Sequence, residues 1–338
     1  MRYVSKSLVL LGFAVGVCCI VYPLTLWTIG QTVFPAQANG SLVTGPDGTP
    51  VGSRLIAQPF TKDEYFQPRP SAVSYDASAS APSNLAASNY MLRNRVAGIL
   101  GPLVKYRTGP KAGQPVGADV ERWFVKDQFH GEPHLVAQWA DAHNAVAQAW
   151  TKADPTHATY VDEWAKAHPK NVEQWVKDNP DTPAPAAADL AVVFFEDFSK
   201  QNPGKWLATA SHTTDDGKTE SSVELVTDGT DMQSTFFDMW RDEHADADLE
   251  SVPADMVMTS GSGLDPNITL ANARYQLDRV ATQWAKDLSR DPADVRREID
   301  AVLEERAAAP LGGFVGTKLI NVLEVNLELR QRYGAPAA

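Results

Sequence analysis

A long uncharged segment near the N-terminus limits this chain more than any other feature. The 22 residues from Leu8 to Ile29 carry no charge, and the next charged residue after Lys6 is Asp47. A helix of that length spans about 30 Å, which matches the hydrocarbon core of a bilayer. The segment therefore predicts one membrane-spanning helix, from Leu8 to Ile29, within an anchor region 1–36.

The charges at the start of the chain predict its orientation. Arg2 and Lys6 precede the apolar segment, and the positive-inside rule places such residues in the cytoplasm. We expect a single-pass protein of the cell inner membrane, with its main domain periplasmic or extracellular. The alternative is a cleaved signal peptide, because Ala36-Gln37-Ala38 has the small-x-small pattern of a cleavage site. The apolar segment is longer than the usual core of about 7–15 residues, which favours a retained anchor.

Charge and cysteine content exclude several classes of protein. The chain has 30 basic and 42 acidic residues and a formal net charge of −12. A nucleic-acid binder needs a basic face to displace counterions from phosphates, so nucleic acid is not an expected partner. The two cysteines, Cys18 and Cys19, lie in the apolar segment and cannot form a disulfide framework or a zinc cluster.

Residues 37–104 are rich in turn formers and predict the first part of an exported α+β domain. Two short β-type runs, 41–44 and 51–56, are joined by a turn at 45–48, which indicates a hairpin. Three prolines within 58–72 exclude a helix interior there. A helix capped by Asn89 is expected to begin near Tyr90.

Residues 105–250 differ in composition and predict an inserted, mainly helical, Trp-rich subdomain. All seven histidines and seven of the nine tryptophans lie there. Four tryptophans recur at spacings of 11, 14 and 11 residues: Trp139, Trp150, Trp164 and Trp175. This spacing suits either one helix face or a chain of short helices, each stopped by a proline soon after its tryptophan. The apolar run 190–195 is expected to form a buried strand.

Residues 251–338 return to the earlier composition and predict the second part of the α+β domain. Thr269 is a plausible N-cap for a helix with apolar residues at helical spacing. Asp291-Pro292 predicts the start of a second helix, and Pro310 ends it. Residues 318–329 suit a strand, a helix, or one followed by the other.

No arrangement of residues points to catalysis or to a metal site. His130 and His134 are four apart, but Gly131 and Pro133 favour a surface turn over a metal-binding helix. The loop 259–266 is rich in serine and glycine and offers backbone N–H groups to an anion, although a structural turn is the more common role. It lacks the Gly-Lys-Ser/Thr ending of a P-loop. We therefore expect no catalytic residues and no active site in this chain itself.

Short motifs at both ends of the chain occur in a characteristic order. They are Tyr22-Pro23, Phe34-Pro35, residues 37–42, 51–58, Phe60-Thr61, Tyr65-Phe66, 69–72, 75–77, 83–85 and 88–89, followed by 252–257, 260–266, Ile268, 279–281 and 322–327. In this order they closely resemble the C subunit of the Kdp potassium-transporting ATPase, the KdpC family. The resemblance covers about 1–104 and 251–330, whereas 105–250 has no counterpart in the family pattern.

The resemblance implies an accessory, non-catalytic subunit of an ATP-driven potassium importer, needed for assembly. The implied partners are a potassium-channel-like subunit, a P-type ATPase subunit and the membrane, with K⁺ as the transported ion. No firmly bound cofactor is implied, and ATP enters only through the complex. Two roles are proposed for the family. One is a catalytic chaperone that raises the ATP affinity of the P-type subunit, and the other is a cap over the external ion entrance, which the expected orientation favours.

The resemblance also suggests two sets of contact residues. The nucleotide or subunit contacts would be Ser260, Gly261, Ser262, Gly263, Leu264, Asp265, Pro266 and Gln276. The further subunit contacts would be Gln37, Asn39, Gly40 and Ser41. A hypothesis of another class is a membrane-anchored exported binding module, whose Trp-rich repeat grips a glycan or a peptide through exposed aromatic rings. Tryptophans on one helix face are more often part of a core.

Overall fold

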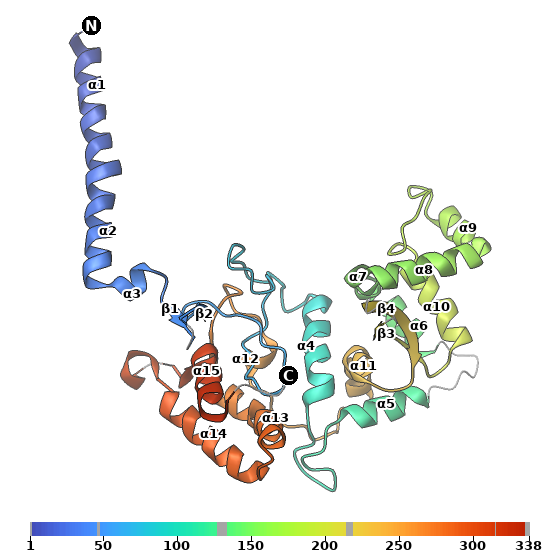
Figure 1. Cartoon of the computed structure of the whole chain (residues 1–338). Helices are drawn as coiled ribbons and strands as arrows, with labels where there is room; N and C mark the ends of the chain where they lie inside the picture. The colour runs from blue at the N-terminus through green and yellow to red at the C-terminus, as the bar shows by residue number, and fades with distance from the viewer. Residues whose placement is uncertain (1, 46–47, 127–133, 214–218, 315, 335–338) are drawn as a thin grey trace. The chain divides into compact units, whose positions relative to one another are not determined.

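The computed structural model describes residues 2–45, 48–126, 134–213, 219–314 and 316–334. It divides into two compact units, which Figure 1 shows with their helices and strands labelled. The first unit combines Met1–Ser83 with Pro253–Ala338, and the second is Asn84–Val252. The first unit is thus built from both ends of the chain, as an insertion into an exposed connection would produce.

A single helical segment, Arg2–Val33, occupies the N-terminal end of the first unit (Figure 1). It consists of α1 (Arg2–Val15), a π-helical turn η1 (Gly16–Val21) and α2 (Tyr22–Val33). Its most apolar stretch is not buried against the rest of the chain, unlike the core helix of a soluble protein. The segment is therefore long and apolar enough to cross a membrane, and the π-helical turn lies just before Pro23, which cannot donate a backbone hydrogen bond.

The folded part of the first unit is a mixture of helices and short antiparallel strand pairs. The predicted hairpin is present, since β1 pairs with β2. A separate strand pair is formed by β5 and β6. The elements in chain order are α3 (Pro35–Ala38), β1 (Leu42–Thr44), β2 (Pro50–Ser53), α12 (Ala254–Val257), β5 (Asn267–Thr269), α13 (Leu270–Leu288), α14 (Pro292–Arg306), η2 (Pro310–Gly313), β6 (Leu319–Asn321) and α15 (Val322–Tyr333).

The predicted helix starts of this unit are formed by side-chain caps. Thr269 Oγ1 accepts a hydrogen bond of 3.0 Å from Asn272 N, and Asp291 Oδ1 accepts one of 2.7 Å from Ala293 N. Residues 318–329 form a strand followed by a helix, because Asn321 caps the start of α15. Helices α13, α14 and α15 then bury their apolar faces together with Ile268, Ile320 and Phe66.

The second unit is mainly helical and contains one antiparallel strand pair, β3 with β4, in register from Trp206↔Val226 to Thr213↔Thr219. Its elements are α4 (Tyr90–Leu103), α5 (Gly117–Val125), α6 (Leu135–Ala142), α7 (Asn144–Ala153), α8 (Pro155–Ala167), α9 (Pro169–Asp178), α10 (Ala191–Gln201), β3 (Trp206–Thr213), β4 (Thr219–Val226) and α11 (Thr230–Glu243). As predicted, Asn89 caps α4 through a 2.9 Å hydrogen bond from Met91 N.

The expectation of a strand at 190–195 is wrong, because this run belongs to helix α10. Its buried residues Ala191, Phe194, Phe195 and Phe198 follow the i, i+3, i+4, i+7 pattern of one helix face. The stripe becomes visible only when the window is extended past residue 195. A short apolar run cannot by itself separate a buried strand from a buried helix.

The tryptophan repeat marks the ends of short helices. Helices α6, α7, α8 and α9 each end three residues after their tryptophan, and a polar residue follows. His168 Nδ1 contacts Trp164 O at 2.9 Å, and Asn179 Nδ2 donates to Trp175 O at 2.9 Å. His244 caps α11 in the same way, with Nδ1 at 2.8 Å from Trp240 O. The repeated pair therefore satisfies carbonyl groups that a helix end leaves unpaired.

The tryptophans of this unit form part of its core and not an exposed row. None of the seven is exposed, and Trp139, Trp206 and Trp240 are at most 2% exposed. Trp206 stacks on Phe195 and meets Phe236 edge to face, with ring centroids 5.5 and 5.0 Å apart. Rings packed in this way cannot grip a glycan or a peptide.

The histidine pair considered for metal binding is only partly described. His134 is 2% exposed and precedes α6, which corrects the expected position on a surface turn. His130 lies outside the described residues. Burial of His134 follows from its place directly before the buried N-terminal turn of α6, where Leu135 and Val136 enter the core.

We expect the stability of the second unit to fall when His143 becomes protonated. The His143 ring stacks on Tyr90 with centroids 3.5 Å apart, and burial lowers its pKa below the ordinary value, against a smaller opposite effect of Asp238. The unfolded chain therefore takes up the proton first, so stability is complete above pH about 6.5 and is lost as the pH falls below it. Denaturant titrations of the full chain in detergent at pH 7 and pH 5 measure this loss.

The matched variant is His143→Phe, which keeps an aromatic ring on Tyr90 without a titratable group. We expect a smaller loss of stability between pH 7 and pH 5 than in the unchanged chain. An equal loss in both proteins would contradict the assignment to His143.

Candidate functional site

The serine-glycine loop, residues 259–266, lies between α12 and β5 and is held by another loop, residues 69–81, which contains turns at 72–75 and 77–78. Ser260 is 3% exposed, and its N–H donates to Pro70 O at 3.3 Å. Arg69 donates to Thr259 O at 3.1 Å, and its guanidinium lies 3.7 Å from Asp265. The loop is therefore fixed by contacts between residues at least 190 positions apart in the sequence.

Serine hydroxyls and a backbone amide occupy the carbonyl groups of this loop. Ser71 Oγ donates to Gly263 O at 2.7 Å, and Ser80 Oγ donates to Ser262 O at 3.1 Å. Ala57 N donates to Leu264 O at 2.9 Å. The serine-glycine sequence thus builds a junction between segments, and only its tip, residues 261–262, is exposed.

The end of the loop leads into the β5–β6 pair. Asp265 Oδ1 accepts hydrogen bonds of 3.0 and 3.2 Å from the backbone and side-chain nitrogens of Asn267. Val322 N donates to Pro266 O at 3.0 Å. Asp265 and Pro266 therefore connect the loop to the starts of α13 and α15, which follow the two strands.

Gln276 from α13 is buried, being 4% exposed, and its amide is bonded to the backbone of Gln67. Its Oε1 accepts from Gln67 N at 2.8 Å, and its Nε2 donates to Gln67 O at 3.0 Å. Its Nε2 also donates to Asn272 Oδ1 at 2.8 Å, and its Oε1 accepts from Arg279 at 2.9 Å. These four bonds use the amide within the chain.

Asn326 from α15 forms the same pair of bonds with the backbone of Phe66, the residue before Gln67. Its Oδ1 accepts from Phe66 N, and its Nδ2 donates to Phe66 O, both at 2.9 Å. Each amide side chain replaces the peptide group that a neighbouring strand would offer. We call Gln276 and Asn326 the amide clamp, since together they pair both backbone groups of two consecutive residues.

Two further side chains of α13 extend this attachment towards residue 63. Trp284 Nε1 donates to Glu64 O at 2.9 Å. Arg279 donates to Asp63 O at 2.7 Å and to Tyr65 O at 3.0 Å. Burial lowers the pKa of Arg279, and the nearby Asp63 carboxylate partly opposes that effect. The segment 63–67 is thus fastened to α13 and α15 at every residue.

The second set of predicted contact residues lies where the anchor helix joins the folded part. Asn39 Nδ2 donates to Pro35 O at 2.7 Å, and Ser53 Oγ donates to Gly40 O at 2.7 Å. Gly40 has a φ of 82°, a conformation that glycine adopts without strain. The side chains of Gln37 and Asn39 and residue Gly40 are exposed, and Ser41 is half-buried. No hydrogen bond is described between these residues and the serine-glycine loop.

The structure places residues 309–314 and 316–318 in a loop that sequence reasoning did not single out. Ala308 and Leu319 close its base with two backbone hydrogen bonds of 2.9 Å. Gly312, Gly313 and Gly316 have positive φ values of 66°, 91° and 82°. Phe314 between them is 92% exposed. In the sequence the glycines were interpreted as the end of a helix, although an aromatic residue among them was a signal of an exposed aromatic side chain on a loop.

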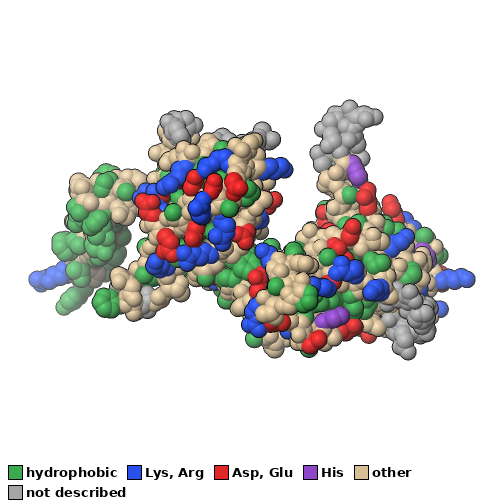
Figure 2. All heavy atoms as spheres, turned by 90° about the horizontal axis from the view of Figure 1, so that it is seen from below, with side chains coloured by type: hydrophobic (Ala, Val, Ile, Leu, Met, Phe, Trp, Pro, Cys, Tyr) green, Lys and Arg blue, Asp and Glu red, His purple; other side chains and the backbone are tan. Residues whose placement is uncertain are grey.

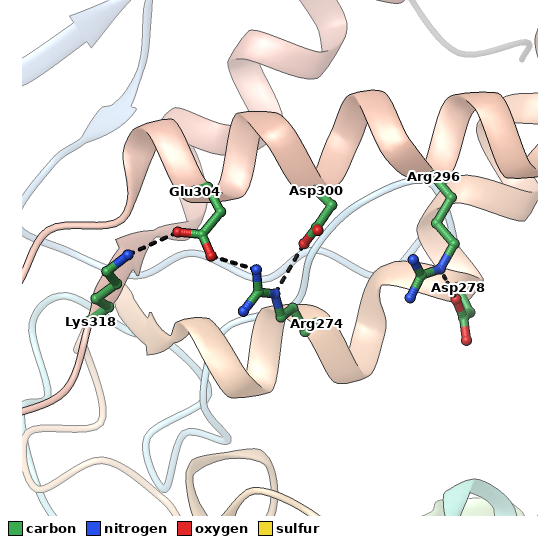
Figure 3. Close-up of polar contacts among 6 residues, drawn as sticks. All are labelled: Arg274, Asp278, Arg296, Asp300, Glu304 and Lys318. Carbon is green, nitrogen blue, oxygen red and sulfur yellow. Dashed lines mark hydrogen bonds and ion pairs between the residues drawn. The ribbon is translucent and has the colours of Figure 1, made fainter.

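Ion pairs hold the base of this loop to two helices, as Figure 3 shows. Lys318 donates to Glu304 of α14 at 2.9 Å, and Arg274 of α13 pairs with both Glu304 and Asp300. Hydrogen bonds from Lys318 and Arg274 hold the pKa of Glu304 below its ordinary value. Exposed pairs add little stability one by one, so the main effect of this array is to fix where the loop leaves the helices.

Paired charges of this kind are typical of the surface. Figure 2 shows acidic and basic side chains intermixed over the face that it draws, without a large field of one sign. Within the described residues, no group of three or more histidine, cysteine, aspartate or glutamate side chains is placed to hold a metal ion.

We expect a substitution at Gly263 of the serine-glycine loop to lower the stability of the chain, and a substitution at Gly261 to be tolerated. A Cβ at Gly263 would lie 2.7 Å from Val73 Cγ2 and 3.0 Å from Ala81 O, and the backbone has a φ of 72°. Gly263→Ala should lower the free energy of unfolding by about 1–3 kcal/mol. Gly261→Ala meets nothing within 4 Å and is the matched control, with an expected change within about 0.5 kcal/mol. Thermal unfolding of both variants measures the loss of stability. An equal loss in the two variants would contradict this account.

Comparison with known proteins gives the family. The family model described as "K+-transporting ATPase, c chain" matches residues 4–120 and 200–331. The segment outside the match, 121–199, is shorter than the 105–250 expected from the sequence. It contains the four tryptophans of the repeat and helices α6 to α9.

Individual relatives agree with this match. The potassium-transporting ATPase KdpC subunit of Caulobacter sp. (strain K31) is 27% identical over 337 residues, which cover 99% of this chain and 96% of that protein. The extra length therefore has a counterpart in that relative. The KdpC subunits of Methanosphaerula palustris and Pseudomonas putida (strain W619) are each 45% identical, over 106 and 108 residues. Those two alignments cover 29% and 32% of this chain, and 57% and 59% of the relatives. The chain belongs to the KdpC family, the C subunits of the potassium-transporting ATPase.

Proposed function

We propose that this chain is an accessory, non-catalytic subunit of an ATP-driven potassium importer and acts as a cap over the external ion entrance. Family membership gives the complex and its transported ion. The observation that carries the rest is the single apolar helix Arg2–Val33, with both of its cationic residues, Arg2 and Lys6, at the N-terminal end. The positive-inside rule then puts the folded units on the outer side, away from cytoplasmic ATP.

The alternative role, a chaperone that contacts nucleotide, has weaker support. The amide of Gln276 is buried and is already bonded to Gln67, Asn272 and Arg279. In the serine-glycine loop, only the tip at residues 261–262 is exposed. We propose that both sets of residues shape the domain and its contact with partner subunits, a potassium-channel-like subunit and a P-type ATPase subunit.

We propose that the second unit is an added helical subdomain, and that 121–199, which the family model does not match, is its most variable part. Its separate aromatic core supports an autonomous folding unit. We propose that the second unit has no catalytic role. We propose that it has a structural or docking role at the outer face.

We expect the folded units to lie outside the cytoplasm. In a chain with Cys18→Ala and Cys19→Ala, a new cysteine at the exposed helix position Thr282 should react with a membrane-impermeant maleimide in intact cells. A cysteine at Ser5 should react only after lysis, because it lies at the cytoplasmic end of the anchor. Protection of Thr282→Cys until lysis would overturn the cap and favour the chaperone.

We expect Phe314 to contribute to binding of the partner subunits. Truncating an exposed aromatic anchor in an interface typically costs about 2 kcal/mol, roughly thirtyfold in affinity. Phe314→Ser should therefore reduce co-purification of the partner subunits in mild detergent, while Phe314→Trp should preserve it. The matched control is Thr282→Ala, which changes another exposed side chain of the same unit. Because Phe314 is 92% exposed, its replacement should leave the thermal stability of the isolated chain unchanged. Normal co-purification of Phe314→Ser would exclude this contact.

A further inference from the structure

A cavity of about 260 Å³ in the second unit is lined mainly by basic and aromatic side chains. Its walls come from α5, from the end of α11 and from the loop between α4 and α5. The unit around it is acidic, since residues 84–252 contain 15 basic and 26 acidic residues. The lining has the opposite balance, with three cationic side chains and one carboxylate. The cavity is therefore a local exception to the charge of its unit.

The charged part of the lining is organised by a single carboxylate, that of Asp119. It accepts hydrogen bonds of 2.6 Å from Tyr106 Oη and from Lys111 Nζ, and it also pairs with Arg122. The Asp119 side chain is only 14% exposed, whereas those of Lys111 and Arg122 are 50% and 60% exposed. One half-buried carboxylate thus orders two accessible cations and leaves an excess of positive charge.

The third cation, Lys126, has no counter-charge. It follows directly after α5, is exposed, and forms no ion pair with any residue that the structure describes. Arg122 lies four residues before it, so two like charges share one face of the helix, which is unfavourable. An anion between the two side chains removes this repulsion and receives hydrogen bonds from both.

The aromatic part of the lining offers a surface for a flat ring. Tyr106 and Trp123 are half-buried, and Trp240 is 2% exposed. The Tyr106 hydroxyl is used by Asp119, as described above. Trp123 Nε1 donates to Glu243 at 2.8 Å. With these polar groups occupied, the side chains contribute mainly apolar surface, and such rings pack favourably on another aromatic ring.

His244 adds one free hydrogen-bonding group to the lining. Its ring stacks on Trp240 with centroids 4.7 Å apart, and its Nδ1 lies 2.8 Å from Trp240 O. Because a carbonyl group only accepts, Nδ1 carries a proton, and Nε2 of the neutral ring is an acceptor. Within the described residues Nε2 has no partner, and it remains accessible to water. A hydroxyl group of a ligand can therefore donate to it.

We propose that this cavity binds a small aromatic carboxylate that carries a hydroxyl group. Arg122 and Lys126 pair with its carboxylate. Its ring packs against Tyr106 and Trp123, and its hydroxyl donates to His244 Nε2. The volume is below the roughly 300 Å³ at which pockets for drug-sized molecules begin, which suits a molecule of one ring. The site lies within the second unit and is independent of the role of the chain in potassium transport.

The test is isothermal titration calorimetry of the full chain in detergent at pH 8, with 4-hydroxybenzoate as the probe. At this pH its carboxyl group is ionised and its phenol keeps the proton. We expect saturable binding at one site per chain. 4-Hydroxybenzamide, which has a neutral amide in place of the carboxylate, should bind at least about tenfold more weakly. Benzoate, which lacks the hydroxyl, should bind about fivefold more weakly.

Two variants assign the groups of the site. Lys126→Gln removes one cation at an exposed position and should weaken binding of 4-hydroxybenzoate about tenfold. His244→Asn keeps a cap on the Trp240 carbonyl, as Asn179 does at the end of α9, but removes Nε2. It should reduce the affinity for 4-hydroxybenzoate to that for benzoate and leave benzoate binding unchanged. Lys166→Gln is the matched control, because Lys166 is exposed on α8 and does not line the cavity, and it should bind as the unchanged chain.

Three results would overturn the proposal. Absence of saturable binding up to about 10 mM would mean that the cations serve only the C-terminal end of α5, where they suit the helix dipole. Equal affinities for 4-hydroxybenzoate and 4-hydroxybenzamide would mean that the cations do not recognise a carboxylate. Binding that is unchanged in both Lys126→Gln and His244→Asn would place the ligand outside this cavity.

Discussion

The first unit depends on how it satisfies the backbone of residues 63–67, which leave a turn and belong to no strand that the structure describes. Residues 63–67 run along α13 and α15, and their peptide groups would be costly to bury unpaired. The amide clamp of Gln276 and Asn326 bonds both backbone groups of Phe66 and Gln67. Trp284 and Arg279 supply donors to the three residues before them. The buried helix faces and this segment can therefore form one core around Phe66.

The same principle explains the serine-glycine loop. Its serines and glycines suit an anion site by composition, yet the N–H groups of Ser260, Gly263 and Leu264 already donate within the chain. Its carbonyl groups accept from Ser71, Ser80 and Ala57. Gly263 is required because a side chain there would collide with Val73 and with the backbone of Ala81. The loop thus joins the two halves of a unit that the second unit interrupts in sequence. Such a junction allows a long insertion without loss of the parent fold.

In the second unit, short helices end after a tryptophan that is followed by a polar residue, and this local pattern is repeated along the chain. Helices α6 to α9 and α11 each end three residues after a tryptophan, and at α8, α9 and α11 a histidine or asparagine side chain bonds the tryptophan carbonyl. The large ring fills the core while the polar neighbour closes the helix end. The tryptophan repeat in the sequence therefore marks the positions at which these helices end. The run at 190–195 was misjudged because its helical stripe continues to Phe198, beyond the window that looked like a strand.

Sequence alone determined the features that act over a few residues or through a fixed order of motifs. These are the long apolar helix near the N-terminus, the caps Asn89, Thr269 and Asp291, the hairpin and the family. Tertiary structure decided which polar groups are consumed within the fold and which stay available. Gln276 and its partner Gln67 are 209 residues apart, and Asn326 and Phe66 are 260 apart. The exposure of Phe314 and the burial of Trp139 likewise follow from neighbours brought together only by folding, because periodicity and capping act within about four residues.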